Sequence, residues 1–385
     1  MGGGRGRMQL ALAAGGAALL LLLLLARLPP PPPRPLHLHQ LYSTDELETV
    51  ELLVAEPSSL PPSAAPPQPV PASKKTPPAG KKAPPAGKNK PPAGKKNPAA
   101  GKKTPPPGKP HVILTKELYV SGHRVAHPEL CPRLGAGLAL LVLVTSAPAH
   151  AAARDAVRLT WGSFAARSDV AIGFVIGEAP PQYREALARE DALYGDVIQG
   201  NWVDSYSNLT LKTLSMLEWA DTYCPRAPRV LKTDDDMFIN IPRLLKFLAD
   251  PQRANATKTI WGKVLKKAYP KRIPASKYYL SRVQWPGAAL PTFATGPAYV
   301  LSADCVRPLL RAAPARAYLR LEDVFVTGVL AGALGLRRQH APEFYNKKVA
   351  PHPCAVQRGV AIHMVRYHEQ FDLWRKLLDG QTKCS

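Results

Sequence analysis

Aromatic residues, acidic residues and cysteines are scarce in this sequence of 385 residues, and the scarcity is uneven. No Phe, Trp or Tyr lies between Ser43 and Leu118, so this stretch cannot form a hydrophobic core. The 28 acidic residues stand against 51 Lys plus Arg, which gives a formal charge of +23. These shortages exclude one compact globule over the whole chain. They leave residues 111–385 as one folded α/β domain that is long enough for a sizeable core.

Only five cysteines are present, and all of them lie beyond residue 130. None has the CxxC or CxxH spacing of a structural zinc site, so we expect no such site. In an oxidising compartment the odd number leaves at least one thiol without a partner. Two acceptor sequons, at Asn208 and Asn255, predict N-glycosylation on a luminal surface.

A hydrophobic segment lies close to the N-terminus. Within residues 8–28, nineteen consecutive residues carry no charge and seven of them are consecutive leucines, which is enough to span a bilayer. Arg5 and Arg7 precede the segment, so the positive-inside rule makes residues 1–7 a cytoplasmic tail. A cleaved signal peptide is the alternative, but an arginine and a proline run follow Ala26 in place of a cleavage site. The sequence predicts a transmembrane signal anchor with the rest of the chain in the lumen.

Residues 29–110 are rich in proline and lysine, and residues 74–108 are five tandem heptads such as KKTPPAG. No heptad position holds a large apolar residue, which excludes a coiled coil. Paired prolines and mutually repelling lysines favour an extended, disordered stem. The alternative is a polyanion-binding tail, because such Lys-Pro repeats resemble the tails of nucleic-acid-binding proteins. A luminal position favours a spacer and argues against nucleic acid as a partner.

Apolar runs and helical patterns alternate along residues 111–385. The run GLALLVLV at 137–144 predicts a buried strand of a largely parallel sheet. Further strands are expected at 170–176, from 196 and at 229–232, and helices at 150–161, 182–194, 208–223 and from Pro242. This alternation predicts a Rossmann-like, nucleotide-binding sheet flanked by helices.

Three consecutive aspartates, Asp234 to Asp236, follow the strand expected at 229–232 and precede Met237-Phe238-Ile239. Carboxylates this close together raise one another's pKa and need a counter-charge. A hard divalent cation supplies that charge and keeps coordination positions for phosphate oxygens. Asp234 and Asp236 would point the same way along an extended chain. An acidic loop at a sheet edge is the plainer alternative, but the apolar flanks favour metal and nucleotide binding.

Seven short segments occur in the order in which the β-1,3-galactosyltransferase family has them, so the chain resembles that family over about 240 residues. They are Arg154-x-x-x-Arg158-x-x-Trp161-Gly162, Gly195-Asp196-Val197-Ile198, Asp204-Ser205-Tyr206-x-Asn208-Leu209-Thr210-Leu211-Lys212-Thr213, Lys232-Thr233-Asp234-Asp235-Asp236, Ser276-Lys277-Tyr278-Tyr279, Tyr299-Val300-Leu301-Ser302 and Glu322-Asp323-Val324-Phe325-Val326. The resemblance implies an inverting glycosyltransferase of the GT-A fold in the Golgi membrane, single-pass and type II. It implies a UDP-sugar donor, a glycan acceptor on a glycoprotein or glycolipid, and Mn²⁺ or Mg²⁺ as cofactor.

The resemblance also assigns the donor side of the site. The expected metal ligands are Asp234, Asp236 and His363. The residues expected at the donor are Thr145, Arg154, Arg158 and Asp235. Arginine suits phosphate or uracil recognition. Two alternatives stay open: a structural role for the histidine after its apolar strand, and surface positions for the two arginines.

On the acceptor side the resemblance makes Asp323 the catalytic base and Glu322 a supporting group, because adjacent helical residues cannot face one point. A charged helix N-terminus is the alternative reading of this pair. Gly296, Ala298 and Tyr299 are expected near the acceptor. Ala298 stands where the family usually has glycine, and an alanine hinders close backbone approach. The acceptor identity therefore stays open.

Cys131 and Cys224 match family positions, and the resemblance implies that they form a disulfide. For the remaining cysteines we expect a pair between Cys305 and Cys354, with Cys384 left over. The leading functional hypothesis is a UDP-galactose β-1,3-galactosyltransferase, and a β-1,3-N-acetylglucosaminyltransferase is the alternative within the family. A catalytically silent Golgi membrane protein with a polyanion-binding stem is the hypothesis from a different class.

Overall fold

The structure is a computed structural model that describes residues 112–384. The predicted tail, anchor and stem at 1–7, 8–28 and 29–110 lie outside the described residues. No helix among residues 112–384 is both long and apolar enough to cross a bilayer. The described residues all belong to one compact unit.

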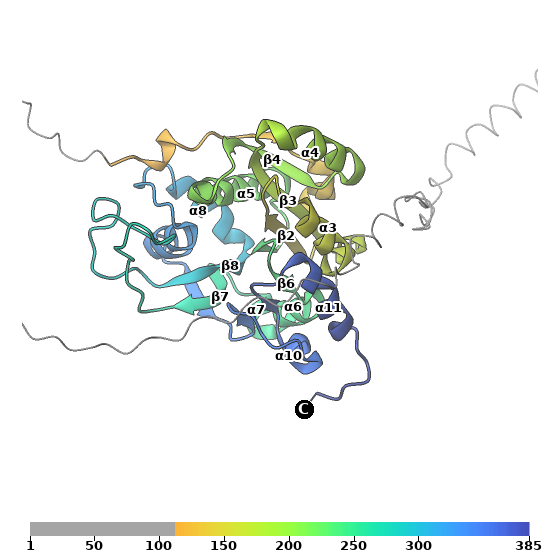
Figure 1. The fold of residues 1–385 in the computed structure, drawn as a ribbon. Helices are drawn as coiled ribbons and strands as arrows, with labels where there is room; N and C mark the ends of the chain where they lie inside the picture. The colour runs from red at the N-terminus through yellow and green to blue at the C-terminus, as the bar shows by residue number, and fades with distance from the viewer. Residues whose placement is uncertain (1–111, 385) are drawn as a thin grey trace, which may run out of the picture. The chain divides into compact units, whose positions relative to one another are not determined.

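An eight-stranded mixed sheet forms the centre of this unit, in the order β1-β4-β3-β2-β5-β8-β7-β9 (Figure 1). β4, β3, β2 and β5 run parallel to one another, whereas β1 is antiparallel to β4 and β8 is antiparallel to both β5 and β7. The strands of this sheet are β1 His123–Val125, β2 Leu140–Thr145, β3 Val170–Glu178, β4 Val197–Val203, β5 Arg229–Asp234, β7 Thr259–Leu265, β8 Phe293–Ser302 and β9 Arg337–His340. A second sheet has the order β10-β11-β6, with β6 Phe238–Ile239, β10 Phe344–Tyr345 and β11 Ala361–Ile362.

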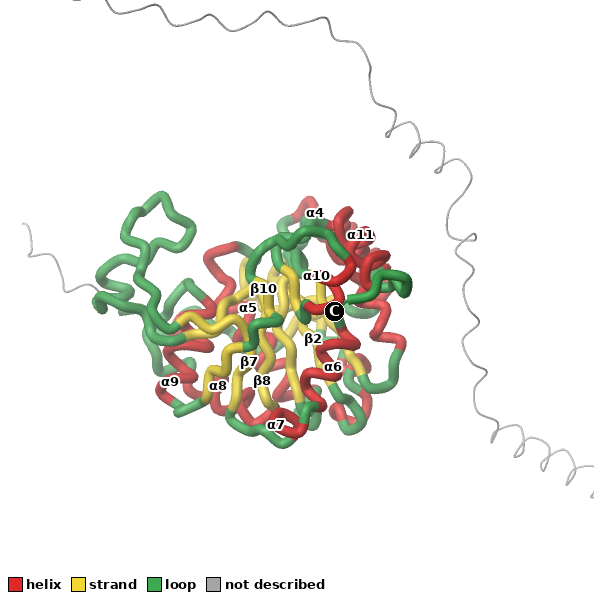
Figure 2. Tube along the Cα trace, turned by 90° about the horizontal axis from the view of Figure 1, so that it is seen from below, coloured by secondary structure: helices red, strands yellow, loops and turns green. Residues whose placement is uncertain are grey.

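Helices pack on both faces of the large sheet, which explains why its central strands are continuous apolar runs (Figure 2). The helices are α3 Ala151–Leu159, α4 Pro181–Tyr194, α5 Leu209–Tyr223, α6 Ile241–Ala249, α7 Pro251–Ala254, α8 Val306–Ala312, α9 Ala331–Ala333, α10 Pro353–Arg358 and α11 Tyr367–Leu377. A π-helix, η8, spans Val324–Leu330. The expected fold class, a mixed α/β sheet flanked by helices, is confirmed.

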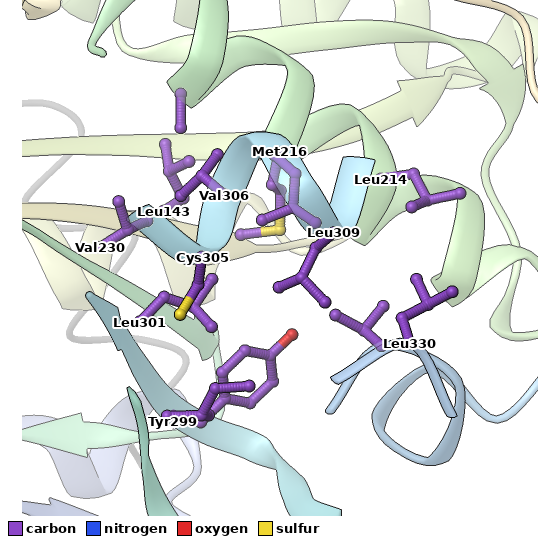
Figure 3. Packing of buried hydrophobic residues seen from close by; sticks show 14 of the residues in the cluster. Leu143, Leu214, Met216, Val230, Tyr299, Leu301, Cys305, Val306, Leu309 and Leu330 are labelled. Atoms are coloured by element: carbon purple, nitrogen blue, oxygen red, sulfur yellow. The ribbon is translucent and has the colours of Figure 1, made fainter. Parts of the chain in front are cut away.

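β2 shows how the sheet divides the core in two. Its alternate residues Leu141 and Leu143 join one cluster with α5, α8 and η8, whereas Leu140, Val142 and Val144 join the other with α3, α6, α10 and α11. This division follows from the two-residue period of a strand. Figure 3 shows the first cluster at close range, where side chains of α5 and α8 pack onto β2, β5 and β8.

The elements expected from the sequence are present, with shifted ends. The strands expected at 137–144 and 229–232 run over Leu140–Thr145 and Arg229–Asp234. The helix expected at 150–161 already ends at Leu159. A 3₁₀ turn follows it and holds Gly162, where a Cβ atom would come within 2.5 Å of the Val157 carbonyl oxygen.

Two disulfides are present, and one of them corrects an expectation. Cys131 pairs with Cys224, with a Cα–Cα distance of 5.6 Å. The expected pair of Cys305 with Cys354 is wrong, because Cys354 pairs with Cys384 and Cys305 is a buried free thiol. Cys305 packs in the core cluster beneath α8, whereas Cys354 lies in α10 on the other face of the sheet.

Candidate active site

The carboxyl ends of β2 and β5 meet in the middle of the large sheet. These strands are parallel neighbours, and their register sets Thr145 beside Asp234. The Thr145 hydroxyl donates a hydrogen bond to the Asp234 carboxylate. Ligands of α/β sheets bind beyond the carboxyl ends of parallel strands, so this edge is where a nucleotide site is expected.

The three aspartates form a turn rather than a continuation of the strand, and we call Asp234–Asp236 the aspartate turn. β5 ends at Asp234, and the next two residues reverse the chain into β6. β6 pairs antiparallel with β11, which brings His363, just beyond β11, next to the turn. His363 Nε2 lies 3.3 Å from Asp236 Oδ2. The pairing of β6 with β11 thus brings together Asp236 and His363, which are far apart in sequence.

Asp235, at the centre of the turn, points away from its two neighbours. Its side chain is buried, and its Oδ2 accepts hydrogen bonds from Ser146 Oγ at 2.7 Å and His150 Nδ1 at 2.8 Å. The hydrogen bond to Asp235 raises the pKa of His150 above its ordinary value, against the opposing effect of burial. The carboxylate therefore faces the loop after β2.

Lys232 is a buried cation between the aspartate turn and the helical segment that begins at Glu322. Its Nζ lies 2.5 Å from Asp234 Oδ1, 2.6 Å from the Gly296 carbonyl oxygen and 3.8 Å from Glu322 Oε2. Burial acts to lower the pKa of Lys232, but the carboxylates of Asp234 and Glu322 outweigh it and raise that pKa. Lys232 therefore supplies the positive charge that this cluster of acids needs.

Glu322 and Asp323 begin the helical segment that continues into η8. Glu322 is buried, and its Oε1 accepts a hydrogen bond from the Tyr299 hydroxyl at 2.6 Å. Asp323 is partly exposed, and its two oxygens accept from Gly296 N at 3.0 Å and Val324 N at 2.8 Å. The two carboxylates therefore have different partners, as their adjacent places on a helix require.

Burial shifts the pKa values of both acids upward. It raises the pKa of Glu322 to about 7, although the nearby Lys232 ammonium acts in the other direction. It also raises the pKa of Asp323, while the backbone N–H groups of Gly296 and Val324 hold the increase back. A carboxylate with a raised pKa is a stronger proton acceptor than one in water.

These groups line one pocket of about 210 Å³. Its lining includes Asp234, Asp236 and His363 from the turn side, Glu322 and Asp323 from the helix side, and Tyr206, Lys232, Lys277, Tyr278, Gly296 and Arg320. A larger cavity of about 350 Å³ beside α4 has Asp191 as the only carboxylate among its lining residues in the described part of the chain, and His127 binds that carboxylate. The smaller pocket is therefore the candidate active site.

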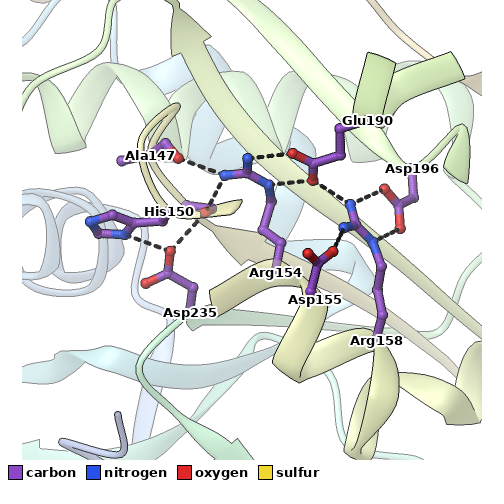
Figure 4. A network of polar contacts seen from close by, with 9 residues as sticks. Ala147, His150, Arg154, Asp155, Arg158, Glu190, Asp196 and Asp235 are labelled. Atoms are coloured by element: carbon purple, nitrogen blue, oxygen red, sulfur yellow. Dashed lines mark hydrogen bonds and ion pairs between the residues drawn. The ribbon is translucent and has the colours of Figure 1, made fainter. Parts of the chain in front are cut away.

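The two arginines expected at the donor do not line this pocket and belong to a network of ion pairs (Figure 4). Arg154 is 0% exposed, and its donors bind Glu190, Ser146 and the Ala147 carbonyl. Arg158 binds Asp155, Glu190 and Asp196. The expected direct contact with a nucleotide is not available to either side chain in this arrangement, because their donors are directed at protein acceptors. The alternative of surface charges does not hold for the fully buried Arg154.

Comparison with known proteins agrees with this geometry. A family model described as Galactosyltransferase matches residues 152–342. Beta-1,3-galactosyltransferase 4 of Rattus norvegicus is 37% identical over 244 residues, which cover 56% of this chain and 66% of that protein. Lactosylceramide 1,3-N-acetyl-beta-D-glucosaminyltransferase of Homo sapiens is 33% identical over 272 residues, which cover 67% of this chain and 70% of that protein. Beta-1,3-galactosyltransferase 5 of Pan paniscus is 33% identical over 244 residues, covering 62% and 80%.

The chain belongs to the galactosyltransferase family. Solved structures with some likeness include a WbbM bifunctional glycosyltransferase, with a TM-score of 0.35 and 12% identity over 64% of this chain and 50% of that one. The galactosyltransferase LgtC, in complex with donor and acceptor sugar analogues, has a TM-score of 0.33 and 10% identity over 63% and 97%. These likenesses are too weak to add to the family assignment.

Of the residues expected near the acceptor, Gly296 lines the pocket and the other two do not. Tyr299 is 0% exposed; its hydroxyl donates to Glu322, and its ring lies 6.0 Å from Lys232 Nζ. Ala298 is buried beside Thr233 in the β5–β8 ladder. Ala298 and Tyr299 are adjacent on β8 and belong to the core clusters on opposite faces of the sheet.

Sequence reasoning missed several residues that line the pocket. Lys232 precedes Asp234 by two strand positions, and the two-residue period could have placed both side chains on one face. Lys277 and Tyr278 belong to a segment that carries the family resemblance, but no chemical role was inferred for them. Arg320 donates to the Lys277 carbonyl oxygen at 2.6 Å and gave no signal in the sequence.

The chemistry of the aspartate turn fits a divalent cation, although within residues 112–384 no group of three His, Cys, Asp or Glu side chains converges to hold a metal ion alone. Asp234 is engaged by Lys232 and Thr145. Asp236 and His363 are close together at the edge of the pocket. One carboxylate and one imidazole suit Mn²⁺ when phosphate oxygens complete the ligand set.

Proposed function

We propose that this galactosyltransferase-family protein transfers a sugar from a UDP-sugar to a 3-hydroxyl of a glycan, with inversion at the anomeric carbon and formation of a β-1,3 linkage. One observation carries the proposal: a carboxylate held by backbone N–H groups, Asp323, lines the same pocket as Asp236 and His363. One pocket therefore holds both a candidate base, Asp323, and candidate ligands for a cation that would bind a diphosphate, Asp236 and His363. A GT-A type of architecture is part of this proposal.

Asp323 has the role of general base. It accepts the proton of the acceptor hydroxyl while that oxygen bonds to C1 of the sugar, and the bond from C1 to the UDP oxygen breaks. Gly296 N and Val324 N orient the Asp323 carboxylate for this transfer. Lys232 and Glu322 form an ion pair beside the base, with Lys232 Nζ 3.8 Å from Glu322 Oε2. The Lys232 charge also acts on the Asp323 carboxylate.

Asp236 and His363 are the residues that would hold Mn²⁺ or Mg²⁺. When bound, such a cation neutralises charge on the leaving diphosphate. Asp234, held by Thr145 and Lys232, would be a further ligand of that cation. Asp235 would contribute to donor binding indirectly, because its hydrogen bonds to Ser146 and His150 hold the aspartate turn in place.

Galactose is the first choice of donor sugar, since the relative with the highest of the identities given above is a β-1,3-galactosyltransferase. N-acetylglucosamine is the second choice, because the human relative at 33% identity is named an N-acetylglucosaminyltransferase. The acceptor is a glycan on a glycoprotein or a glycolipid.

The cellular setting is a proposal from the sequence. Residues 8–28 would anchor the protein in the lipid bilayer of the Golgi as a single-pass type II protein. Residues 29–110 would serve as a stem, and residues 111–385 would be the luminal catalytic domain. This topology predicts that protease spares the domain in intact microsomes and digests it after detergent is added.

The direct test is release of UDP by the purified full-length protein with Mn²⁺, a panel of UDP-sugars and a panel of glycan acceptors. Asp323→Asn is the matched inactive variant, and Asp169→Asn, in an exposed ion pair with Arg167, is the control. We expect acceptor-dependent UDP release by the wild type and the control only. No release with any UDP-sugar and any acceptor would contradict the proposed function and favour a silent protein.

A further inference from the structure

Arg154 divides its hydrogen bonds between a neighbouring helix and the loop after β2 (Figure 4). Its Nε and Nη2 each donate to one oxygen of Glu190 in α4, both at 2.6 Å. Its Nη1 donates to Ser146 Oγ at 3.0 Å and to the Ala147 carbonyl oxygen at 2.6 Å. A fully buried cation is strongly destabilising unless it is matched in this way. One half of the guanidinium therefore holds α4, and the other half holds the loop.

Ser146 passes this connection on to the aspartate turn. It accepts from Arg154 and donates to Asp235 Oδ2 at 2.7 Å. The backbone N–H of Asp235 donates to the Thr145 carbonyl oxygen at 3.1 Å, so two consecutive residues of β2 and its loop hold the same aspartate. Asp235 is therefore fixed from the side of the turn that faces away from the pocket.

Glu190 is fixed in turn by Arg158. Arg158 Nη2 donates to Glu190 Oε1 at 2.7 Å, and the same guanidinium pairs with Asp196 and packs over the rings of Phe174 and Tyr194. Burial acts to raise the pKa of Glu190, but the hydrogen bonds and charges of Arg154 and Arg158 lower it below its ordinary value. The carboxylate that orients Arg154 thus stays ionised.

Arg229 is a buried arginine whose hydrogen bonds do not lead to the aspartate turn. It is also buried, and it donates to the carbonyl oxygens of Pro228, Arg253 and Ala254 at the amino end of β5. Its hydrogen bonds tie loops together at the edge of the sheet opposite to the aspartate turn. Arg229 is therefore a matched case of a purely structural arginine.

We propose that Arg154 is a positioning residue of the donor site and that Glu190 is its orienting partner. Through Ser146 they hold Asp235, and with it the aspartate turn, in the arrangement that binds the diphosphate of a nucleotide-sugar. Arg154 acts without touching the nucleotide. The proposal rests on the proposed function for the identity of the ligand, and on the hydrogen bonds alone for the effect on the turn.

The test compares Ser146→Ala and Glu190→Gln with Arg229→Lys in the full-length protein. We expect the first two to raise the KM for the UDP-sugar by about 10–100-fold, the scale on which partners of metal ligands act, and to change kcat at saturating donor by less than about threefold. We expect hydrogen exchange of the backbone amides in the aspartate turn to become faster in both, without ligand. Arg229→Lys should lower the melting temperature and leave KM and this local exchange unchanged.

The opposite pattern would overturn the proposal. If Ser146→Ala and Glu190→Gln lower the melting temperature but keep the donor KM and the exchange of the aspartate turn at wild-type values, the network is structural only. A wild-type protein that transfers no sugar would contradict the proposed function instead, and the exchange comparison would still decide the role of Arg154. Ser146→Ala removes a single hydroxyl, so it keeps the test valid if Glu190→Gln fails to fold.

Discussion

The two sides of the pocket that we propose for the donor and for the acceptor are built in different ways. On the donor side, Asp235 is 8% exposed and ends a chain of buried hydrogen bonds that runs back to Arg154. Tyr206 and Tyr278 also line the pocket, and they are 49% and 48% exposed. We expect the UDP part of the donor to bind beside the buried, paired side chains, and the acceptor to contact exposed side chains such as these tyrosines.

Lys232 and Gly296 connect the two sides. Lys232 Nζ lies 2.6 Å from the Gly296 carbonyl oxygen, and Gly296 N donates to Asp323 Oδ2 at 3.0 Å. A Cβ atom at Gly296 would lie 3.4 Å from Glu322 Oε2, so the backbone approaches both carboxylates closely. The two sides are neighbours in space but have separate chemical tasks, and the predictions below test that separation.

The largest effect is expected for Asp323→Asn. The amide keeps the shape of the carboxylate but accepts no proton at neutral pH, so kcat should fall by about 10²–10⁴-fold. Turnover with a saturating UDP-sugar and any active acceptor measures this loss. Retention of more than about a tenth of wild-type turnover would mean that Asp323 is not the base, and Glu322 would be the next residue to test.

A smaller effect, on the other side of the pocket, is expected for Asp236→Asn. The substitution removes an anionic ligand without changing its size, so the Mn²⁺ concentration needed for half-maximal turnover should rise by about 10–100-fold. Asp250→Asn, which changes an exposed helix cap remote from the pocket, is the control. An unchanged Mn²⁺ requirement in Asp236→Asn would remove this residue from the metal site.

The free energy of unfolding should depend on pH through the buried Glu322 carboxyl group. The pKa of Glu322 rises from 4.5 to about 7 on folding, so the folded state binds more protons than the unfolded state between these values. The stabilisation is complete below pH 4.5 and is lost as the pH rises through about 7. Urea denaturation should show this loss in the wild type and a flatter pH profile in Glu322→Gln. Parallel profiles would contradict the raised pKa.

The two predicted glycosylation sites, Asn208 and Asn255, differ in their surroundings. Asn255 is exposed beyond α7, whereas Asn208 Nδ2 donates to the Val203 carbonyl oxygen and the Thr210 hydroxyl is buried against Leu319. If the domain is luminal, Asn255→Gln should abolish most of the mobility shift produced by glycosidase, and Asn208→Gln should change little. A shift that depends on Asn208 alone would contradict this order.

The smallest effect is expected for deletion of residues 74–108. If these repeats are a spacer, kcat with a soluble acceptor should stay within about threefold of the wild type. A loss above about tenfold, or about 1.4 kcal/mol of transition-state stabilisation, would show that the repeats contact the substrate or the fold.

Much of the fold and part of the site follow from local sequence patterns. The aliphatic run of β2 and the aspartates after β5 were sufficient to predict a parallel sheet with a polar edge. The carboxylates of the aspartate turn were found because they are consecutive. Asp323 was found through a family resemblance, because the sequence pattern alone is equally typical of a charged helix N-terminus.

The remaining features depend on contacts between segments that are distant in sequence. Arg154 and Glu190 are 36 positions apart, and nothing in either segment indicates that they pair. The partner of Cys354 lies in the C-terminal tail, and only the three-dimensional arrangement of α10 brings them together. Tyr299 was placed near the acceptor from its neighbours in sequence, but strand alternation directs it into the core.

The separation of donor binding from base catalysis is tested most directly by calorimetric titration of UDP in the presence of Mn²⁺. The titration compares the wild type with Asp236→Asn and Asp323→Asn. The account predicts that Asp236→Asn weakens UDP binding by at least about tenfold, which is about 1.4 kcal/mol, whereas Asp323→Asn keeps the wild-type affinity within about twofold. Equal loss of affinity in both variants would contradict the account, because Asp323 would then belong to the donor site.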